Sequence, residues 1–374
     1  MNHILGSQHL SENELRTILS SPIKKGNITY SYQNLYILPE MSTVNTFIRE
    51  EDGHAPLPEQ HVSKNGNYYT TILPREVMFM FRAIMAKLLR LFSHPSNKTP
   101  MIPRQDVQTK KDVLVETSVG PTYISFYYPL AAKKKKLPVY INFHGGAFIM
   151  NDKELDDPYC RYLANQAECV VLNVEYGKAP EYPFPKAIEQ GYEIIQWVKG
   201  RAEELGIEAE KVMVGGQSSG GNIAAALCLY LEEKGDEQPL LQVLSCPMLD
   251  FVTPHAEKPE PDKWRSRFPK AAHFIHMCYV PEKGQAGHLL ASPVRAEVSG
   301  RLASALILIA ESDAFRPEAE SYAEKLKAAG VSVQKAIFRG CSHAFTHLGP
   351  KERAEEAWRM IAGKIKAVAE APPY

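Results

Sequence analysis

The sequence predicts an α/β fold in which a mostly parallel sheet of eight strands is flanked by helices. From Asp112 onward, short apolar segments alternate with segments of helical periodicity. This alternation is typical of parallel strands joined by crossover helices. A Gly-x-Ser-x-Gly segment, Gly216 to Gly220, stands between one such strand and the next helix, and an earlier strand leads into His144-Gly145-Gly146.

The elements follow in order along the chain. Strands are expected over residues 112–117, 122–128, 137–143, 169–174, 212–215, 240–245, 305–310 and 332–338. Helices are expected over residues 156–166, 186–205, 220–234, 317–329 and 351–369. Eight strands with crossover helices are expected to give an α/β fold.

Residues 1–110 lack this alternation, apart from one helix expected over 76–92. Its apolar residues are expected on one stripe, formed by Val77, Phe81, Ile84, Leu88 and Leu91, with Arg82, Lys87 and Arg90 elsewhere. A basic amphipathic helix can lie on a membrane surface, although packing against its own protein is favoured here. No apolar run approaches the ~20 residues that span a bilayer.

Composition excludes several classes of partner. Lys and Arg together number 43, as do Asp and Glu, so no net field attracts nucleic acid or an anionic membrane. Residues 1–15 show no basic segment followed by an apolar run, which predicts no secretion signal. The 6 cysteines lack metal or disulfide spacing, as expected of buried free thiols in the cytoplasm. We expect no metal and no cofactor.

Two motifs indicate nucleophilic catalysis. Small residues around Ser218 suit a sharp strand-to-helix turn that exposes the serine hydroxyl. Attack on an ester carbonyl creates a negative oxygen, which must be met by fixed N–H donors. We expect these donors to be the backbone N–H groups of Gly146 and Ala147, with Gly145 as a further candidate, and that of Ser219 at the helix start.

A serine nucleophile needs a base, and the base needs a carboxylate that orients it. Asp313 follows the strand expected over 305–310, and His343 follows the last strand, so both are expected at the same sheet edge. Glu311 competes with Asp313, and Asp250 is a more distant alternative. His347 competes with His343.

These motifs together resemble the hormone-sensitive-lipase-like branch of the α/β-hydrolase esterases. The family pattern is His-Gly-Gly-Gly, Tyr-Arg-Leu-Ala-Pro-Glu, Gly-Asp-Ser-Ala-Gly-Gly-Asn, Asp-Pro-Leu and His-Gly-Phe. This chain has the corresponding segments in the same order, from about residue 137 to its end: His144 to Ala147, Tyr176 to Glu181, Gly216 to Asn222, Asp313 to Phe315 and His343 to Phe345.

Several positions depart from the family pattern. Ala147 replaces a glycine, although alanine resists positive φ. Gly177-Lys178 replaces Arg-Leu, which removes a guanidinium that would help to fix the neighbouring loop. Gln217, Ala314-Phe315 and Ala344 also differ from the pattern. Because none of these changes removes a triad residue, we expect an altered rate or specificity and not an inactive protein.

The resemblance implies an α/β-hydrolase fold with a mainly helical cap over the pocket. The expected division is an N-terminal region contributing to the cap (1–110), the first part of the core (111–250), a cap insertion (251–290) and the second part of the core (291–374). Aromatic residues in the insertion suit an acyl-chain wall, or equally a core.

The expected function is hydrolysis of carboxylic esters of short to medium acyl chain through an acyl-enzyme on Ser218, with His343 as base and Asp313 as its partner. The molecule that the protein is expected to bind is thus a small ester. We expect the protein to bind no nucleic acid and to contact no membrane, and a homodimer is left open. The alternatives are an interfacial lipase, an amidase or deacetylase, and a non-catalytic ligand-binding receptor of the same fold.

Overall fold

A computed structural model describes residues 75–93, 102–131, 135–150, 153–259 and 270–371, together with two short strand pairs nearer the N-terminus. The chain divides into two compact units, Met1–Lys87 and Leu88–Tyr374. In the first unit, β1 (Ile23–Lys25) pairs antiparallel with β2 (Ile28–Tyr30), and β3 (His61–Val62) with β4 (Tyr68–Tyr69). Most of the N-terminal region assigned to the cap lies outside the described residues, namely residues 1–22, 26–27, 31–60, 63–67, 70–74 and 94–101.

Helix α2 (Arg75–Ser93) confirms the helix expected over 76–92, but the predicted apolar stripe is wrong at its first two positions. Val77 and Phe81 are 37% and 38% exposed, whereas Phe79 and Ala83 are buried. Apolar side chains occur on several sides of this helix, so the sequence pattern does not select one face. The helix passes from the first unit into the second, which begins at Leu88.

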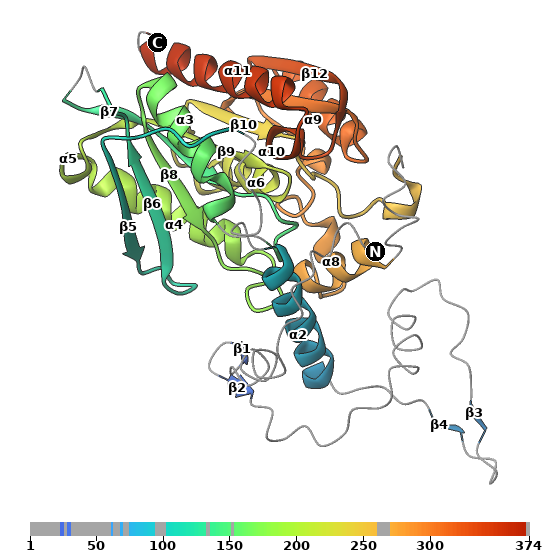
Figure 1. Ribbon diagram of the computed structural model, residues 1–374. Helices are drawn as coiled ribbons and strands as arrows, with labels where there is room; N and C mark the ends of the chain where they lie inside the picture. The colour runs from blue at the N-terminus through green and yellow to red at the C-terminus, as the bar shows by residue number, and fades with distance from the viewer. Residues whose placement is uncertain are drawn as a thin grey trace. The chain divides into compact units, whose positions relative to one another are not determined.

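The second unit is built on one eight-stranded sheet, in the order β12-β11-β10-β9-β7-β8-β6-β5 (Figure 1). Its strands are β5 (Thr109–Val115), β6 (Thr122–Tyr128), β7 (Leu137–Phe143), β8 (Val170–Glu175), β9 (Ile207–Gln217), β10 (Leu241–Ser245), β11 (Ser304–Ser312) and β12 (Val333–Ser342). Strands β7 to β12 are parallel, and β6 runs antiparallel to both of its neighbours. The predicted mostly parallel sheet of eight strands is confirmed.

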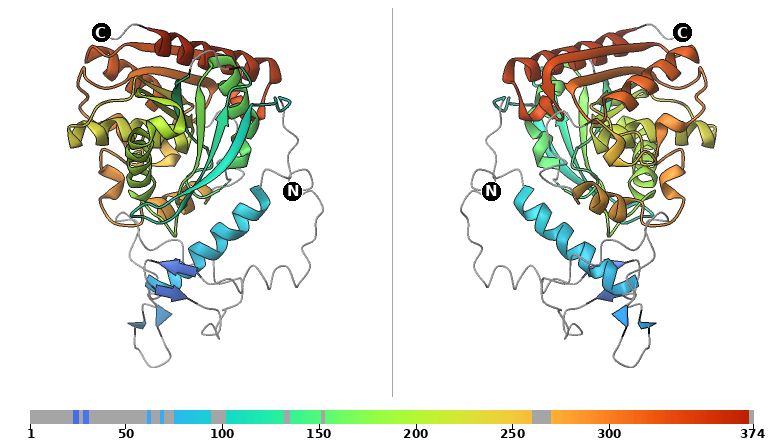
Figure 2. Two further views of the ribbon diagram at one scale, coloured as in Figure 1. Left: turned by 90° about the vertical axis from the view of Figure 1, so that its left-hand side faces the viewer. Right: turned by 90° about the vertical axis from the view of Figure 1, so that its right-hand side faces the viewer.

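Helices cover both faces of this sheet. They are α3 (Asp157–Ala167), α4 (Lys186–Gly200), α5 (Ala202–Leu205), α6 (Ser219–Lys234), α8 (Ala271–Tyr279), α9 (Arg316–Ala328), α10 (Phe345–Leu348) and α11 (Lys351–Glu370), with 3₁₀ turns η4 (Lys153–Asp156), η5 (His255–Glu257), η6 (Gln285–Gly287) and η7 (Pro293–Arg295). Helix α11 lies beside α3 on one face (Figure 2), and α4, α6 and α9 pack on the other. Each layer buries the apolar side chains of one sheet face.

Several elements differ from the expectation. Strand β5 spans Thr109–Val115 where 112–117 was expected, and β12 continues to Ser342, four residues past its expected end. The strand expected over 212–215 begins five residues earlier, at Ile207. The helix expected over 186–205 is interrupted after Gly200, a residue of low helix propensity, and resumes as α5. Helix α8, which the sequence pattern did not reveal, forms within the predicted insertion.

The parallel strands all present their carboxyl ends at the same edge of the sheet, where loops after β7, β9, β11 and β12 meet. In open α/β sheets this edge is where ligands bind. Among the described residues, no helix is both long and apolar enough to cross a membrane.

Candidate active site

Ser218 occupies a sharp turn between β9 and α6, with φ 55° and ψ −113°. This conformation is strained for a residue with a side chain. The glycines on either side permit the turn: a Cβ at Gly216 would lie 2.2 Å from the carbonyl oxygen of Phe143, and one at Gly220 would lie 1.8 Å from it. The turn therefore packs directly on the carboxyl end of β7, beside the His144 loop.

Three side chains from separate loops form a continuous chain of hydrogen bonds. His343 Nε2 lies 3.0 Å from Ser218 Oγ, and His343 Nδ1 lies 2.8 Å from Asp313 Oδ2. The His343 side chain is 30% exposed, and that of Asp313 is 2% exposed. The three predicted residues thus have the contacts that their expected roles require.

The competing residues lie elsewhere. Glu311 is exposed and accepts a hydrogen bond from the Gly340 N–H at 2.8 Å. Asp250 pairs with Arg295 at 3.0 Å. The His347 side chain is 8% exposed and lies against Asp156, with 3.1 Å between Nε2 and Oδ1. None of the three makes a described contact with Ser218.

Asp313 is held by a second hydrogen bond, in which the Phe315 N–H donates to Oδ1 at 2.9 Å. The thiol of Cys246 lies beside this carboxylate. Within the described ranges, Cys246, Asp313 and His343 are the one set of three side chains of metal-binding type that lie close enough together to hold an ion. Burial, and then the charge of Asp313, raises the pKa of the Cys246 thiol well above its usual value. A protonated thiol beside an already hydrogen-bonded His–Asp pair does not fit a metal ion.

The loop after β7 forms a tight turn with unpaired donors. Gly146 has φ 139°, and Ala147 follows with φ 53°. The N–H groups of Ile149 and Met150 both donate to the Gly146 carbonyl, at 3.0 and 2.8 Å. Within the described part of the chain, neither the Gly146 N–H nor the Ala147 N–H donates to another group.

Two further predicted positions lie next to this turn. Ser219 is the first residue of α6, where helix N–H groups lack intrahelical partners. Gly145 lies against the side chain of Gln217, since a Cβ at Gly145 would fall 2.5 Å from Gln217 Oε1. Gln217, which directly precedes Ser218 and differs from the family pattern, therefore contacts the predicted oxyanion loop.

His144 anchors the start of this loop. Its side chain is fully buried and stacks on Tyr176 with 4.5 Å between ring centroids. Its Nδ1 lies 2.8 Å from the Gly145 carbonyl, and the Tyr176 hydroxyl donates to the His144 carbonyl at 3.0 Å. Burial, and then the charge of Lys178, lowers the pKa of His144 to about 3, so the ring is neutral near pH 7.

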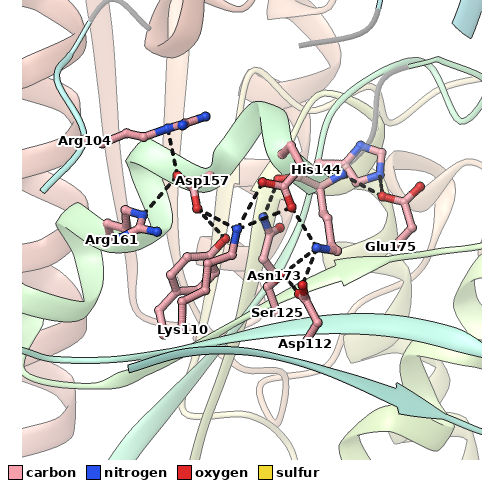
Figure 3. Close-up of polar contacts among 12 residues, drawn as sticks. Arg104, Lys110, Asp112, Ser125, His144, Asp157, Arg161, Asn173 and Glu175 are labelled. Atoms are coloured by element: carbon pink, nitrogen blue, oxygen red, sulfur yellow. Dashed lines mark hydrogen bonds and ion pairs between the residues drawn. The ribbon is translucent and has the colours of Figure 1, made fainter. Parts of the chain in front are cut away.

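A network of charged side chains lies beside His144 and connects the first strands of the sheet to η4 and α3 (Figure 3). Lys110 pairs with Asp157 at 3.0 Å, and Lys153 with Asp112 at 2.9 Å. Glu175 accepts a hydrogen bond from the Lys153 N–H at 2.6 Å and pairs with Lys178. These groups pair with one another, and Glu175 Oε2 lies 3.8 Å from His144 Nε2, so the network supports the start of the loop.

Aromatic rings also lie at the turn and beside His343. Phe148, directly after Ala147, stacks on Tyr279 at the end of α8, and Phe251 lies 5.3 Å from Tyr279. Phe315 meets the His343 ring edge-on at 5.1 Å. Trp264 and Phe268, two aromatic residues of the insertion expected over 251–290, lie outside the described residues.

Sequence reasoning missed Arg90, whose guanidinium in the last turn of α2 contacts the loops at residues 149 and 179–181. The helical periodicity of residues 76–92 does not indicate this role, because the loops that Arg90 contacts are about sixty to ninety residues away in the chain. Tyr279 was missed for the same reason.

Comparison with known proteins agrees with the fold described above. A family model described as alpha/beta hydrolase fold matches residues 140–347. An arylesterase of Saccharolobus solfataricus is 28% identical over 80% of this chain and 95% of its own length. A carboxylesterase of Mycobacterium tuberculosis is 32% identical over 66% of this chain and 78% of its own. The solved structure of a Pyrobaculum calidifontis esterase has a TM-score of 0.66 and 28% identity, and covers 80% of this chain and 95% of that one.

The family match covers more than half of the chain, and the topology of the sheet agrees with it. The relatives named above are esterases. The chain therefore belongs to the α/β-hydrolase-fold family and, within it, to the hormone-sensitive-lipase-like group of carboxylesterases.

Proposed function

We propose that this protein cleaves carboxylic esters of short to medium acyl chain through an acyl-enzyme intermediate on Ser218. The observation that carries the proposal is the hydrogen-bonded sequence from Ser218 through His343 to Asp313, 3.0 and 2.8 Å in length. A serine hydroxyl in such a chain can transfer its proton as it attacks a carbonyl.

In the first half of the reaction, Ser218 Oγ attacks the ester carbonyl while its proton passes to His343 Nε2. Asp313 accepts the hydrogen bond from Nδ1–H and stabilises the resulting imidazolium. His343 then gives the proton to the departing alcohol, and the acyl group stays on Ser218. In the second half, water replaces the alcohol, His343 takes its proton, and the carboxylic acid leaves as Ser218 regains a proton.

The negative oxygen formed in each half is met by the N–H groups of Gly146, Ala147 and Ser219, with Gly145 as a further donor. The N–H groups of Gly146 and Ala147, which donate to no group among the described residues, and the first N–H of α6 support this role, because they can donate to an oxygen. Donors that are fixed before the reaction need no rearrangement when charge develops.

The preference for small acyl groups rests on the side chains around the site. Phe315 is partly exposed beside the partly exposed His343, and Phe148 and Tyr279 fill the space next to the turn. Bulky rings at the turn and beside the base favour a compact substrate. The names of the relatives, an arylesterase and a carboxylesterase, support an ester substrate and carry no information on chain length.

The test is hydrolysis of p-nitrophenyl esters from acetate to palmitate by the wild type and by Ser218→Ala, with the thermal unfolding midpoint as the fold control. We expect the highest kcat/KM on short chains and a loss of several orders of magnitude in the variant. Retained activity in Ser218→Ala would overturn the mechanism. A rise in rate only above the solubility limit of the ester would favour an interfacial lipase instead.

If the folded wild type hydrolyses none of the esters, the ligand-binding receptor becomes the better hypothesis. The cytoplasmic location, the homodimer, the absence of nucleic-acid binding and the division into cap and core stay predictions from the sequence.

A further inference from the structure

Arg90 connects two loops that lie beside the reacting serine. Its Nε donates to the Ile149 carbonyl at 2.8 Å, and its Nη2 donates to the Ala179 carbonyl at 2.7 Å. The same guanidinium forms a two-point ion pair with Glu181, with Nη1–Oε1 and Nη2–Oε2 distances of 2.9 and 2.7 Å. Four hydrogen bonds from one planar group fix its orientation.

The first of these loops is the turn whose N–H groups are proposed to hold the oxyanion. Ile149 belongs to the turn itself, because its N–H donates to the Gly146 carbonyl at 3.0 Å. The second loop is joined to the turn by one backbone hydrogen bond, from the Ala179 N–H to the Phe148 carbonyl at 3.0 Å. Arg90 therefore adds a second connection between the same two loops, one residue further along the turn.

This connection occurs where the chain lacks the arginine of the family pattern. Position 177 is a glycine that cannot accept a side chain without rearrangement, because a Cβ there would lie 2.7 Å from Tyr182 Cγ and 3.1 Å from Gln190 Oε1. A guanidinium from another segment, more than eighty residues upstream, thus contacts the loop that follows this glycine.

We infer that Arg90 is a positioning residue for the oxyanion-binding turn, and that the last turn of α2 is thereby part of the machinery of this esterase. The inference rests on the proposed function. Removing the guanidinium leaves the Ile149 and Ala179 carbonyls and the Glu181 carboxylate without this donor. The turn can then shift, and its N–H groups lose their alignment with an oxygen that becomes negative only in the transition state. Such a loss lowers kcat and leaves KM largely unchanged.

Four full-length variants test the inference by steady-state kinetics on p-nitrophenyl acetate. Arg90→Ala removes the guanidinium. Arg90→Lys keeps the positive charge but not the planar group that donates several hydrogen bonds at once. Glu181→Gln keeps a hydrogen-bond acceptor but not the negative charge. The matched control is Arg75→Ala, which removes an exposed guanidinium from the first turn of the same helix. The thermal unfolding midpoint is measured for each variant.

We expect kcat to fall about 10- to 100-fold in Arg90→Ala, with KM within about 3-fold of wild type. Arg90→Lys and Glu181→Gln are expected to lie in between, and Arg75→Ala to match the wild type. A kcat for Arg90→Ala within about 2-fold of wild type, in a preparation where Ser218→Ala is inactive, overturns the inference and leaves the proposed function intact. If Arg90→Ala fails to fold, Arg90→Lys and Glu181→Gln decide by the same criterion.

Amide hydrogen exchange provides a readout that does not depend on turnover. Arg90→Ala is expected to speed exchange in peptides covering residues 146–150 and 178–182, and not in peptides from α11. Unchanged exchange in the first two segments overturns the inference even if the wild type proves inactive on every ester, an outcome that would by itself overturn only the proposed function.

Discussion

The ring of Phe148 lies flat on the ring of Tyr279, with 3.5 Å between centroids and 12° between planes. One ring belongs to the turn that follows β7, and the other ends helix α8 of the predicted cap insertion. The contact joins the proposed oxyanion turn to the element that is expected to cover the pocket. A change in α8 can therefore reach the chemistry without touching the substrate.

Truncating Tyr279 tests this contact. Tyr279→Ala leaves a cavity in a fully buried position and is expected to lower the free energy of unfolding by about 3 kcal/mol, and to lower kcat because the turn loses its support. Tyr279→Phe is the matched control, since the hydroxyl has no hydrogen-bond partner among the described residues. It is expected to stay within about 1 kcal/mol of wild type by chemical denaturation, and a large loss in this variant would contradict the interpretation.

Asp313 is expected to be the carboxylate on which the rate depends. Asp313→Asn removes the charge that orients His343 and is expected to lower kcat by about 10³- to 10⁴-fold. Glu311→Gln is the control, because the Glu311 side chain contacts the Gly340 N–H and not His343. Equal losses in the two variants, measured with p-nitrophenyl acetate, would rule out the assignment.

The buried His144 predicts a dependence of stability on acid pH. Its pKa is lowered to about 3 in the folded chain, against about 6.5 when unfolded. Between these two values the unfolded chain binds a proton that the folded chain does not, so stability falls as the pH falls. From pH 6 to pH 4, the wild type should lose about 2 kcal/mol more free energy of unfolding than His144→Asn, which cannot titrate. Urea titrations give the free energy of unfolding at each pH. An equal loss from pH 6 to pH 4 in the two proteins would refute this source of acid sensitivity.

Two alanines occupy conformations that suit glycine. Ala147 has φ 53° and Ala344 has φ 63°, and both stand where the family pattern has glycine. Ala344→Gly is expected to raise the free energy of unfolding by about 0.5 to 1 kcal/mol, because left-handed backbone costs a non-glycine residue more than glycine loses in entropy. Ala367→Gly, at an exposed site within α11, should change stability by a similar amount in the opposite direction. Destabilisation by both substitutions would show that Ala344 is not strained.

The sequence predicted most of the sheet because its buried strands are short apolar runs between helices. The strands expected over 122–128 and 137–143 match β6 and β7 at both ends. The extension of β9 back to Ile207 was not predicted, because Glu208 and Lys211 break the apolar pattern although they lie within the strand. Pattern reasoning detects the buried part of a strand and misses a part whose polar side chains reach solvent.

The residues of the proposed site also fall into those that the sequence could predict and those that it could not. Ser218, His343 and Asp313 could be proposed because each follows a recognisable strand, and strand order then determines which loops meet. Arg90 and Tyr279 could not, since their roles depend on contacts between segments far apart in the chain. The buried face of α2 was also misjudged, because Val77 and Phe81 are as apolar as the residues that are buried.

All 6 cysteines of the chain are buried and free. Alkylating reagents that require an accessible thiolate should therefore leave the native protein unmodified. The natural thiols would therefore not react during site-specific labelling. One cysteine introduced on the surface would be a unique attachment point for a fluorophore or spin label. A pair of such labels, on α8 and on the last turn of α2, would report movements of these two elements without replacing any natural thiol.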